Sequence, residues 1–141
     1  MKPTSQTKSG PNALVEKAVG SFGKLDIVVN NAGVEKKETF VDYPFADLQK
    51  ILAVNLVGPF LVAQAAARQM IRQGHGGRVI NISSVHEDLP SPTNAAYCAS
   101  KGRLRMLTRT IAIEASGQDH GQQHRAWRGL HADRCGHRGH A

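Results

Sequence analysis

The residues best suited to chemistry are a tyrosine and a lysine four positions apart, Tyr97 and Lys101. In a helix this spacing places both side chains on one face, one turn apart. A free phenol has a pKa of ~10 and is a poor acid or base at neutral pH, but a nearby cation stabilises its anion and lowers that pKa. The pair is therefore suited to proton transfer, although an exposed helix pair without a function has the same spacing.

A phenol of this kind needs a second group that holds the substrate oxygen in line with it. Ser83 and Ser84 stand at the end of a short β-branched run that starts at Arg78 and has the composition of a buried strand. The carboxyl ends of strands are where an α/β sheet presents its ligand groups. Both serines therefore lie where such a group is expected.

These groups need a scaffold, and the chain alternates strand-like and helical segments. Strands are expected at 25–30 and 78–83, long helices at 45–73 and 95–115, and a short helix at 13–19. Gly58 and Pro59 should kink the first long helix. Strand, helix, strand, helix is the repeat of an α/β fold with a parallel sheet, in which the strand at 25–30 would be buried on both faces.

Four motifs in order make residues 13–115 similar to the short-chain dehydrogenase/reductases. They are Asn30-Asn-Ala-Gly33, Val54-Asn55, Ile80-Asn-Ile-Ser-Ser84 and Tyr97-Cys-Ala-Ser-Lys101-Gly102. The resemblance implies a partial Rossmann-like α/β fold, with a doubly wound parallel sheet flanked by helices. It also implies hydride transfer between NAD or NADP and an alcohol, sugar or carbonyl substrate, and dimers or tetramers formed through the two long helices.

Position by position, the resemblance makes Tyr97 the acid/base and Ser84 the residue that holds the substrate oxygen. Ser83 has the wrong spacing for that role. Lys101 would bind the nicotinamide ribose and lower the pKa of the tyrosine. Asn55 would hold a water of the proton relay from a local break in its helix. Without the resemblance, Asn55 is equally well a core amide that must find hydrogen-bond partners.

Other residues near the motifs also have a functional and a plain structural interpretation. Asn30, Ala32 and Gly33 would line the adenosine side of the cofactor, or would only end a strand with Asn and Gly at positive φ. His86 lies in a Ser-Val-His-Glu sequence that resembles glucose 1-dehydrogenase-like members, and it would contact substrate or be a solvated loop residue. Cys98 is interpreted as a small packed residue rather than a nucleophile.

The sequence departs from the family before the first motif. Nothing before Asn12 resembles the Thr-Gly-x-x-x-Gly-x-Gly loop that receives the cofactor pyrophosphate, or the strand that selects NAD or NADP. We therefore expect a chain truncated at its N-terminus, which binds NAD(P)H weakly and turns over negligibly. The alternative function is an inactive fragment that only folds or associates with relatives.

After Glu114 the family pattern gives way to a segment rich in Gly, Gln, His and Arg. Reverse translation of residues 121–129, moved forward by one base, permits Val-Asn-Asn-Ile-Ala-Pro-Gly-Ala, which is the strand and Pro-Gly loop of the family. We infer a frameshift near residues 114–116, and hence an irregular tail without a core element. His131, Cys135 and His137 lack the spacing of a zinc site, so no metal is expected.

Composition and charge limit the remaining classes. The chain has 141 residues, a formal net charge of +7 and two cysteines, which favours one domain in a reducing cytoplasm. Arg and His gather in the tail, while the centre mixes both signs and has few aromatic residues for base stacking, so a nucleic-acid module is disfavoured. No apolar run approaches the ~20 residues of a membrane span, and we expect a soluble chain. The expected organisation is a disordered start at 1–11, the central part of the domain at 12–115 and the tail at 116–141.

Overall fold

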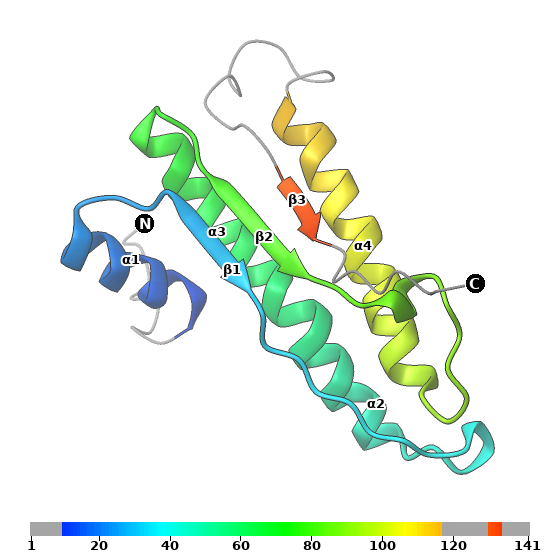
Figure 1. The fold of residues 1–141 in the computed structure, drawn as a ribbon. Coiled ribbons are helices and arrows are strands. Elements are labelled where there is room, and N and C mark those ends of the chain that lie inside the picture. Colours follow the sequence, from blue (N-terminus) through cyan, green and yellow to red (C-terminus); the bar gives the residue numbers. More distant parts are fainter. Residues whose placement is uncertain (1–9, 117–129, 134–141) are drawn as a thin grey trace, which may run out of the picture.

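The computed structural model describes residues 10–116 and the backbone of residues 130–133. Helices alternate with short strands (Figure 1). In chain order the elements are α1 (Pro11–Phe22), β1 (Ile27–Asn30), the 3-10 turn η1 (Phe40–Asp42), α2 (Phe45–Leu52), the π-helical turn η2 (Ala53–Val57), α3 (Gly58–Gln73), β2 (Arg78–Ile82), the 3-10 turn η3 (Val85–Glu87), α4 (Ala95–Ser116) and β3 (Leu130–Asp133). The helices and strands predicted at 13–115 are confirmed, with ends that differ by up to three residues.

α1 begins earlier and ends later than predicted. Pro11 belongs to its first turn, where a proline loses no hydrogen bond, so Pro11 is not part of a disordered start. Gly20 lies inside the helix, and Gly23 ends it in the left-handed conformation at φ 79°. The remaining start at 1–9 lies outside the described residues. So does the tail at 117–129 and 134–141, with Cys135 and His137.

The three strands form one parallel sheet in the order β1-β2-β3. Asn30 pairs with Asn81, so β1 and β2 end at the same edge of the sheet. β3 pairs with the other side of β2, and the prediction of a tail without a core element is therefore wrong for residues 130–133. A strand edge carries unpaired backbone groups that an extended segment satisfies whatever its side chains are. A prediction from side-chain pattern misses such a pairing.

The core lies between the sheet and the helices α3 and α4. Its buried residues are Ala63, Ala66, Met70, Val79 and Ala115. Small residues on α3 let the helix approach the sheet closely, and Met70 fills the remaining space. A Cβ added at Gly77 would lie 2.4 Å from the Met70 sulfur, so the close approach of the chain to Met70 requires a glycine.

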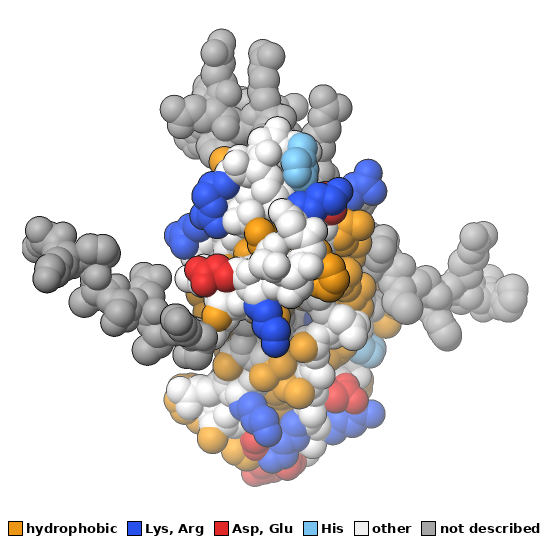
Figure 2. All heavy atoms as spheres, turned by 90° about the vertical axis from the view of Figure 1, so that its left-hand side faces the viewer, with side chains coloured by type: hydrophobic (Ala, Val, Ile, Leu, Met, Phe, Trp, Pro, Cys, Tyr) orange, Lys and Arg blue, Asp and Glu red, His pale blue; other side chains and the backbone are white. Residues whose placement is uncertain are grey.

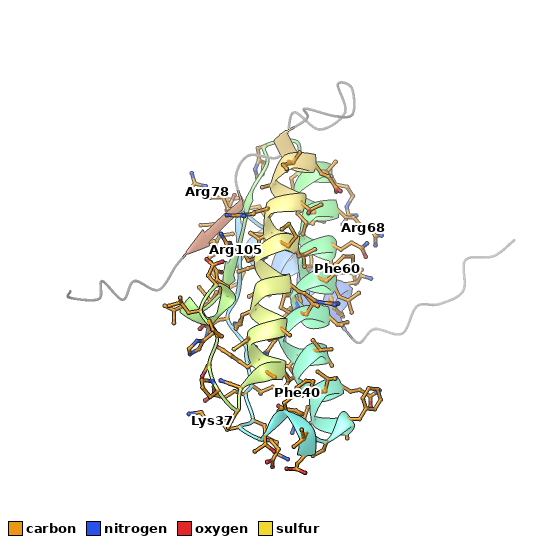
Figure 3. The ribbon with its side chains drawn as sticks, turned by 90° about the vertical axis from the view of Figure 1, so that its right-hand side faces the viewer. Lys37, Phe40, Phe60, Arg68, Arg78 and Arg105 are labelled. Carbon is orange, nitrogen blue, oxygen red and sulfur yellow. The ribbon has the colours of Figure 1, made fainter. Side chains whose placement is uncertain are left out.

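The described helices all lie on one side of the sheet, and the other face is open (Figures 1 and 3). Ile27 and Val29 of β1 point to the open face and are 55% and 54% exposed. Figure 2 shows hydrophobic side chains along the right-hand edge of its view, the side on which this face lies. The prediction that this strand is buried on both faces is therefore wrong. Its β-branched composition favours burial, but no described element covers it. The second helical layer of a doubly wound sheet is likewise not among the described elements.

The predicted kink in the first long helix is a π-helical turn. η2 occupies Ala53–Val57, directly before Gly58 and Pro59, and joins α2 to α3. A π-helical turn locally interrupts the regular hydrogen-bond ladder of a helix, and such turns are frequent at functional sites. Asn55 lies at the centre of this break.

Together α2, η2 and α3 form a helical segment of 29 residues with a mean hydropathy of 1.5 in its most apolar part. By length and composition alone it could cross a membrane, and the prediction that no apolar run approaches this length is wrong. Polar residues such as Asn55 and Gln64 interrupt the segment, so no uninterrupted apolar run marks it, but the surrounding Leu, Val and Ala residues keep its mean hydropathy high. A core helix of a soluble protein passes the same test, and this segment supplies Ala63, Ala66 and Met70 to the core.

Candidate active site

Tyr97 and Lys101 lie in the first two turns of α4 and face one another. The Lys101 Nζ atom is 5.7 Å from the centre of the Tyr97 ring, close enough for attraction between a cation and an aromatic face. Lys101 is 4% exposed, and its Nζ donates to the Ile82 carbonyl at the end of β2 at 2.8 Å. Burial lowers the pKa of Lys101, and the negative charge of Glu87 opposes this shift. The amine is thus anchored between a strand end and the phenol.

Ser84 follows β2 and begins the turn η3. Its Oγ accepts a hydrogen bond from the backbone N–H of His86 at 3.2 Å, a contact that does not use the hydroxyl proton. The His86 ring stands edge-on to the Tyr97 ring, with 6.3 Å between ring centres and 78° between planes. The turn that carries Ser84 therefore lies beside the phenol. Ser83, in contrast, is 8% exposed, and its buried hydroxyl makes no hydrogen bond with the described residues.

Asn55 is fully buried in η2 and joins two other parts of the site. Its amide accepts from the Val34 N–H and donates to the Val34 carbonyl, both at 2.8 Å. It also donates to the Ser100 hydroxyl at 3.0 Å, which in turn donates to the Tyr97 carbonyl at 2.7 Å. The side chain has the core hydrogen-bonding role that the sequence allowed, and it ties the segment after β1 to α4.

Asn30 points into the fold rather than out of it. Its amide donates to the Pro59 carbonyl at 3.3 Å and to the Asn81 side chain at 2.8 Å. Asn81 donates onward to the Thr108 hydroxyl at 2.9 Å. A line of polar side chains therefore runs from β1 through β2 to α4, below the edge that carries the candidate catalytic residues.

The turn after β1 does not use positive φ. Thr93 is the one non-glycine residue with positive φ in the described part of the chain, and Asn30 and Gly33 have none, so the plain interpretation of this turn is wrong. A Cβ added at Gly33 would stand in ordinary contact, 3.7 Å from both the Asn55 Oδ1 and the Lys101 Nζ. The exposed backbone of Gly33 thus lies directly beside the buried amide and the amine.

Cys98 and His86 lie next to these candidate site residues. Cys98 is a half-buried free thiol. The His86 ring nitrogen Nδ1 lies 3.1 Å from the Leu89 carbonyl, so this ring is not simply solvated. Within residues 10–116, no three His, Cys, Asp or Glu side chains gather as metal ligands do.

Three polar residues that build the site were missed by sequence reasoning. Asn81 and Ser100 are fully buried, and the Glu87 side chain is 5% exposed. A polar residue inside an apolar strand was a usable signal for Asn81, because a buried amide needs partners. Glu87 gave no signal, since an acidic loop residue is usually solvated.

The arrangement can move a proton. A phenol, a lysine side chain and a serine-bearing turn meet at the carboxyl edge of a parallel sheet. The phenol can exchange a proton with a carbonyl or alcohol oxygen, while the positive charge on Lys101, when it is protonated, stabilises the phenolate.

Comparison with known proteins supports this interpretation. Residues 4–119 match the family described as short chain dehydrogenase. The chain is 48% identical over 100 residues to the uncharacterized oxidoreductase YohF of Escherichia coli K12, and 40% identical over 107 residues to glucose 1-dehydrogenase 2 of Bacillus subtilis 168. These alignments cover 71% and 75% of this chain, but 40% and 42% of the relatives.

Solved structures agree with the fold. The acetoin dehydrogenase YohF from Salmonella typhimurium is similar with a TM-score of 0.71 and 46% identity, over 74% of this chain and 42% of that one. A gluconate 5-dehydrogenase from Burkholderia cenocepacia, in complex with NADP and tartrate, is similar with a TM-score of 0.72 and 37% identity, over 88% of this chain and 44% of that one. The chain thus spans about two fifths of the length of these relatives.

Proposed function

The chain belongs to the short-chain dehydrogenase family, and on this basis we propose that Tyr97, Lys101, Ser84 and Asn55 form the proton-transfer part of an oxidoreductase active site. The reaction would be hydride exchange between NAD or NADP and a small alcohol, sugar or carbonyl compound. The observation that carries the proposal is the anchored Lys101 amine, 5.7 Å from the Tyr97 ring and beside the exposed backbone of Gly33.

The residues present fit a nicotinamide cofactor at the ends of β1 and β2. Gly33 has neither positive φ nor a crowded Cβ position, so packing within the chain does not explain a glycine there. The missing side chain keeps the Lys101 amine approachable. Lys101 and Tyr97 would bind the nicotinamide ribose, and Ala32 and Gly33 would line the adenosine side. Asn30 would contribute its backbone, because its side chain is turned inward.

The chain's own residues would handle the proton, while the bound cofactor supplies or accepts the hydride. Tyr97 donates a proton to the substrate oxygen in reduction and removes it in oxidation. Ser84 donates a hydrogen bond to the same oxygen. Protonated Lys101 stabilises the phenolate. The Asn55 side chain is committed to Val34, so a relay water would be held by the main chain of the π-helical turn.

The substrate class follows from the relatives and from the polar surroundings of the phenol. The similar proteins include an acetoin dehydrogenase, a glucose 1-dehydrogenase and a gluconate 5-dehydrogenase. His86 adds a ring nitrogen next to Tyr97. We therefore favour a small hydroxylated carbonyl compound or its alcohol, in a cytoplasmic enzyme.

A homo-oligomer, dimer or tetramer, is also proposed. Phe60 and Leu61 of α3 are 44% and 42% exposed, and Met106 of α4 is 59% exposed. Figure 3 shows Phe60 on the outer side of the helices, away from the sheet. A second copy of the chain would cover these helix faces, which gel filtration with light scattering would detect.

The proposed function can be tested by titrating the chain with NADH and NADPH under backbone NMR. We expect shifts at the amides of Gly33, Tyr97 and Lys101. Binding should be weaker than micromolar, because the sequence has no pyrophosphate loop pattern. Lys101→Met should abolish the shifts, and Lys50→Met, at an exposed lysine of α2, should leave them unchanged. Shifts that persist in Lys101→Met would refute the site. Saturation at micromolar concentration in calorimetry would refute the expected weakness.

An inactive fragment is the second candidate, and the open sheet face is consistent with it. Ile27 and Val29 are more than half exposed, which makes self-association or binding to a relative favourable. Far-UV circular dichroism and gel filtration would distinguish a compact chain from an aggregating one. Turnover that is lost in Tyr97→Phe would exclude the inactive fragment.

We further propose that residues 12–115 are the central part of the family domain and that the tail is read out of frame. Resequencing of the coding DNA tests this directly. An inserted or deleted base near codons 114–116 supports the proposal, and an intact frame confirmed from independent clones contradicts it.

A further inference from the structure

α4 carries one more charged residue on the stripe that holds the phenol and the lysine. Tyr97, Lys101 and Arg105 follow at intervals of four, which places them in line along one helix face. Arg105 is 21% exposed on its side chain and lies on the side of α4 that faces the turn after β2 (Figure 3). Its guanidinium contacts two consecutive carboxylates, Glu87 and Asp88.

The contacts differ in their surroundings. The Arg105 Nε lies 3.6 Å from the Glu87 Oε1, and that glutamate side chain is 5% exposed. Nη1 pairs with Asp88, whose side chain is 47% exposed. A nearly buried carboxylate is costly unless cations compensate it, whereas an exposed one is compensated by water. The contact with Glu87 therefore carries most of the expected effect.

The acidic residues belong to the same hydrogen-bonded turn as Ser84. The Glu87 N–H donates to the Ser84 carbonyl at 3.1 Å, and the N–H groups of Asp88 and Leu89 donate to the Val85 carbonyl at 3.3 and 3.0 Å. Because the turn is bonded internally from its first residue to its last, a restraint on Glu87 and Asp88 also restrains Ser84.

The turn also rests directly on the helix. A Cβ added at Gly102 would lie 3.4 Å from the Glu87 carbonyl, so the turn packs against the α4 backbone next to Lys101. Glu87 acts electrostatically on Lys101 as well. The Glu87 carboxylate therefore interacts with both Lys101 and Arg105, which lie one turn apart on α4.

We propose that Arg105, through Glu87 and Asp88, is a positioning residue that holds the turn carrying Ser84 in register with Tyr97 on α4. The inference rests on the proposed function for its catalytic meaning. The contact between the turn and α4 can be tested independently of the proposed function.

The test is a spectroscopic signature of that register. In the unaltered chain we expect a nuclear Overhauser effect between the ring protons of His86 and Tyr97, which stand edge-on. Arg105→Met should remove it and speed exchange of the amides of residues 87–89 by at least about tenfold, equal to ~1.4 kcal/mol of local opening. Arg109→Met is the matched control, because Arg109 is exposed on the same helix and has no ion pair in the described part of the chain.

Removal of charge from the other side should give the same two changes. The double variant Glu87→Gln with Asp88→Asn keeps the size of both side chains and deletes the carboxylates. The proposal is overturned if the ring contact survives in both variants, or if Arg109→Met loses it as well. It is also overturned if exchange rises equally in β2, because that would show a general loss of stability. Since no cofactor is present in these measurements, they can fail while NADH binding succeeds, and the reverse.

Discussion

Replacing Asn55 by alanine should show that this amide holds the site together. The substitution deletes three side-chain hydrogen bonds, two to the backbone of Val34 and one to Ser100. At ~1 kcal/mol each, they account for ~3 kcal/mol, and the loss of partners for the two Val34 backbone groups raises the cost. We expect the free energy of unfolding to fall by about 3–5 kcal/mol, a large part of the ~5–15 kcal/mol typical of a domain.

The assay is urea unfolding followed by far-UV circular dichroism, with hydrogen exchange of the Val34 amide as a local readout. Asn55→Asp removes the two donated bonds without opening a cavity, because aspartate keeps the size but cannot donate to Val34 or Ser100, and its buried carboxylate adds a further cost. The free energy of unfolding of Asn55→Asp should therefore fall by at least as much as that of Asn55→Ala. Asn31→Ala is the control, since Asn31 is exposed in the same motif. A loss below ~1 kcal/mol in Asn55→Ala, or one equal to the control, would refute the reasoning.

Three further predictions concern individual residues. Gly33→Ala should leave the free energy of unfolding unchanged or raise it by up to ~1 kcal/mol, because the φ and the neighbours of Gly33 accept a Cβ. The same substitution should weaken the NADH-induced NMR shifts, and unfolding at lower urea would contradict the prediction. Gly77→Ala should destabilise by about 1–3 kcal/mol in the same urea assay, because its Cβ would overlap buried Met70, and an unchanged midpoint would contradict it. The pKa of Lys101 is lowered by burial, so just below the ordinary lysine pKa the unfolded chain holds the proton that the folded chain has lost. The free energy of unfolding should therefore rise with pH in that range, compared with Lys101→Met. Parallel pH profiles of the unaltered chain and Lys101→Met would contradict the assignment. Glu87→Gln should lower the pKa of Lys101 further, as followed by NMR of ¹³C-labelled lysine.

Much of the fold and of the candidate site could be predicted from the sequence. The alternation of strands and helices could be predicted because the spacing of apolar side chains indicates which face of an element is buried. The pairing of Tyr97 with Lys101 followed from a four-residue spacing within one helix. The resemblance implied a local break at Asn55, and Gly58 and Pro59 predicted a kink next to it; the structure has a π-helical turn at Ala53–Val57.

The errors arose where long-range packing decides. The exposure of Ile27 depends on whether another layer covers the sheet, which composition cannot report. β3 depends on backbone pairing, which leaves little trace in side chains. The links among Asn30, Asn81 and Thr108 join residues far apart in the chain, and no spacing rule connects them. The turn after β1 looked like a positive-φ turn, because Asn and Gly favour that conformation without requiring it.

The line from Asn30 through Asn81 to Thr108 also discriminates against mispaired folds. Side chains alternate along a strand, so sliding β2 by one residue would turn Asn81 outward and bring an isoleucine, Ile80 or Ile82, under α4. The amides would then lose one another, and the Thr108 hydroxyl would face hydrocarbon. A slipped register would therefore break these polar contacts, although hydrophobic packing alone would tolerate it. These three residues make one alignment of the strands preferable to its neighbours, so that the edge bearing Ser84 and Gly33 forms in a single way.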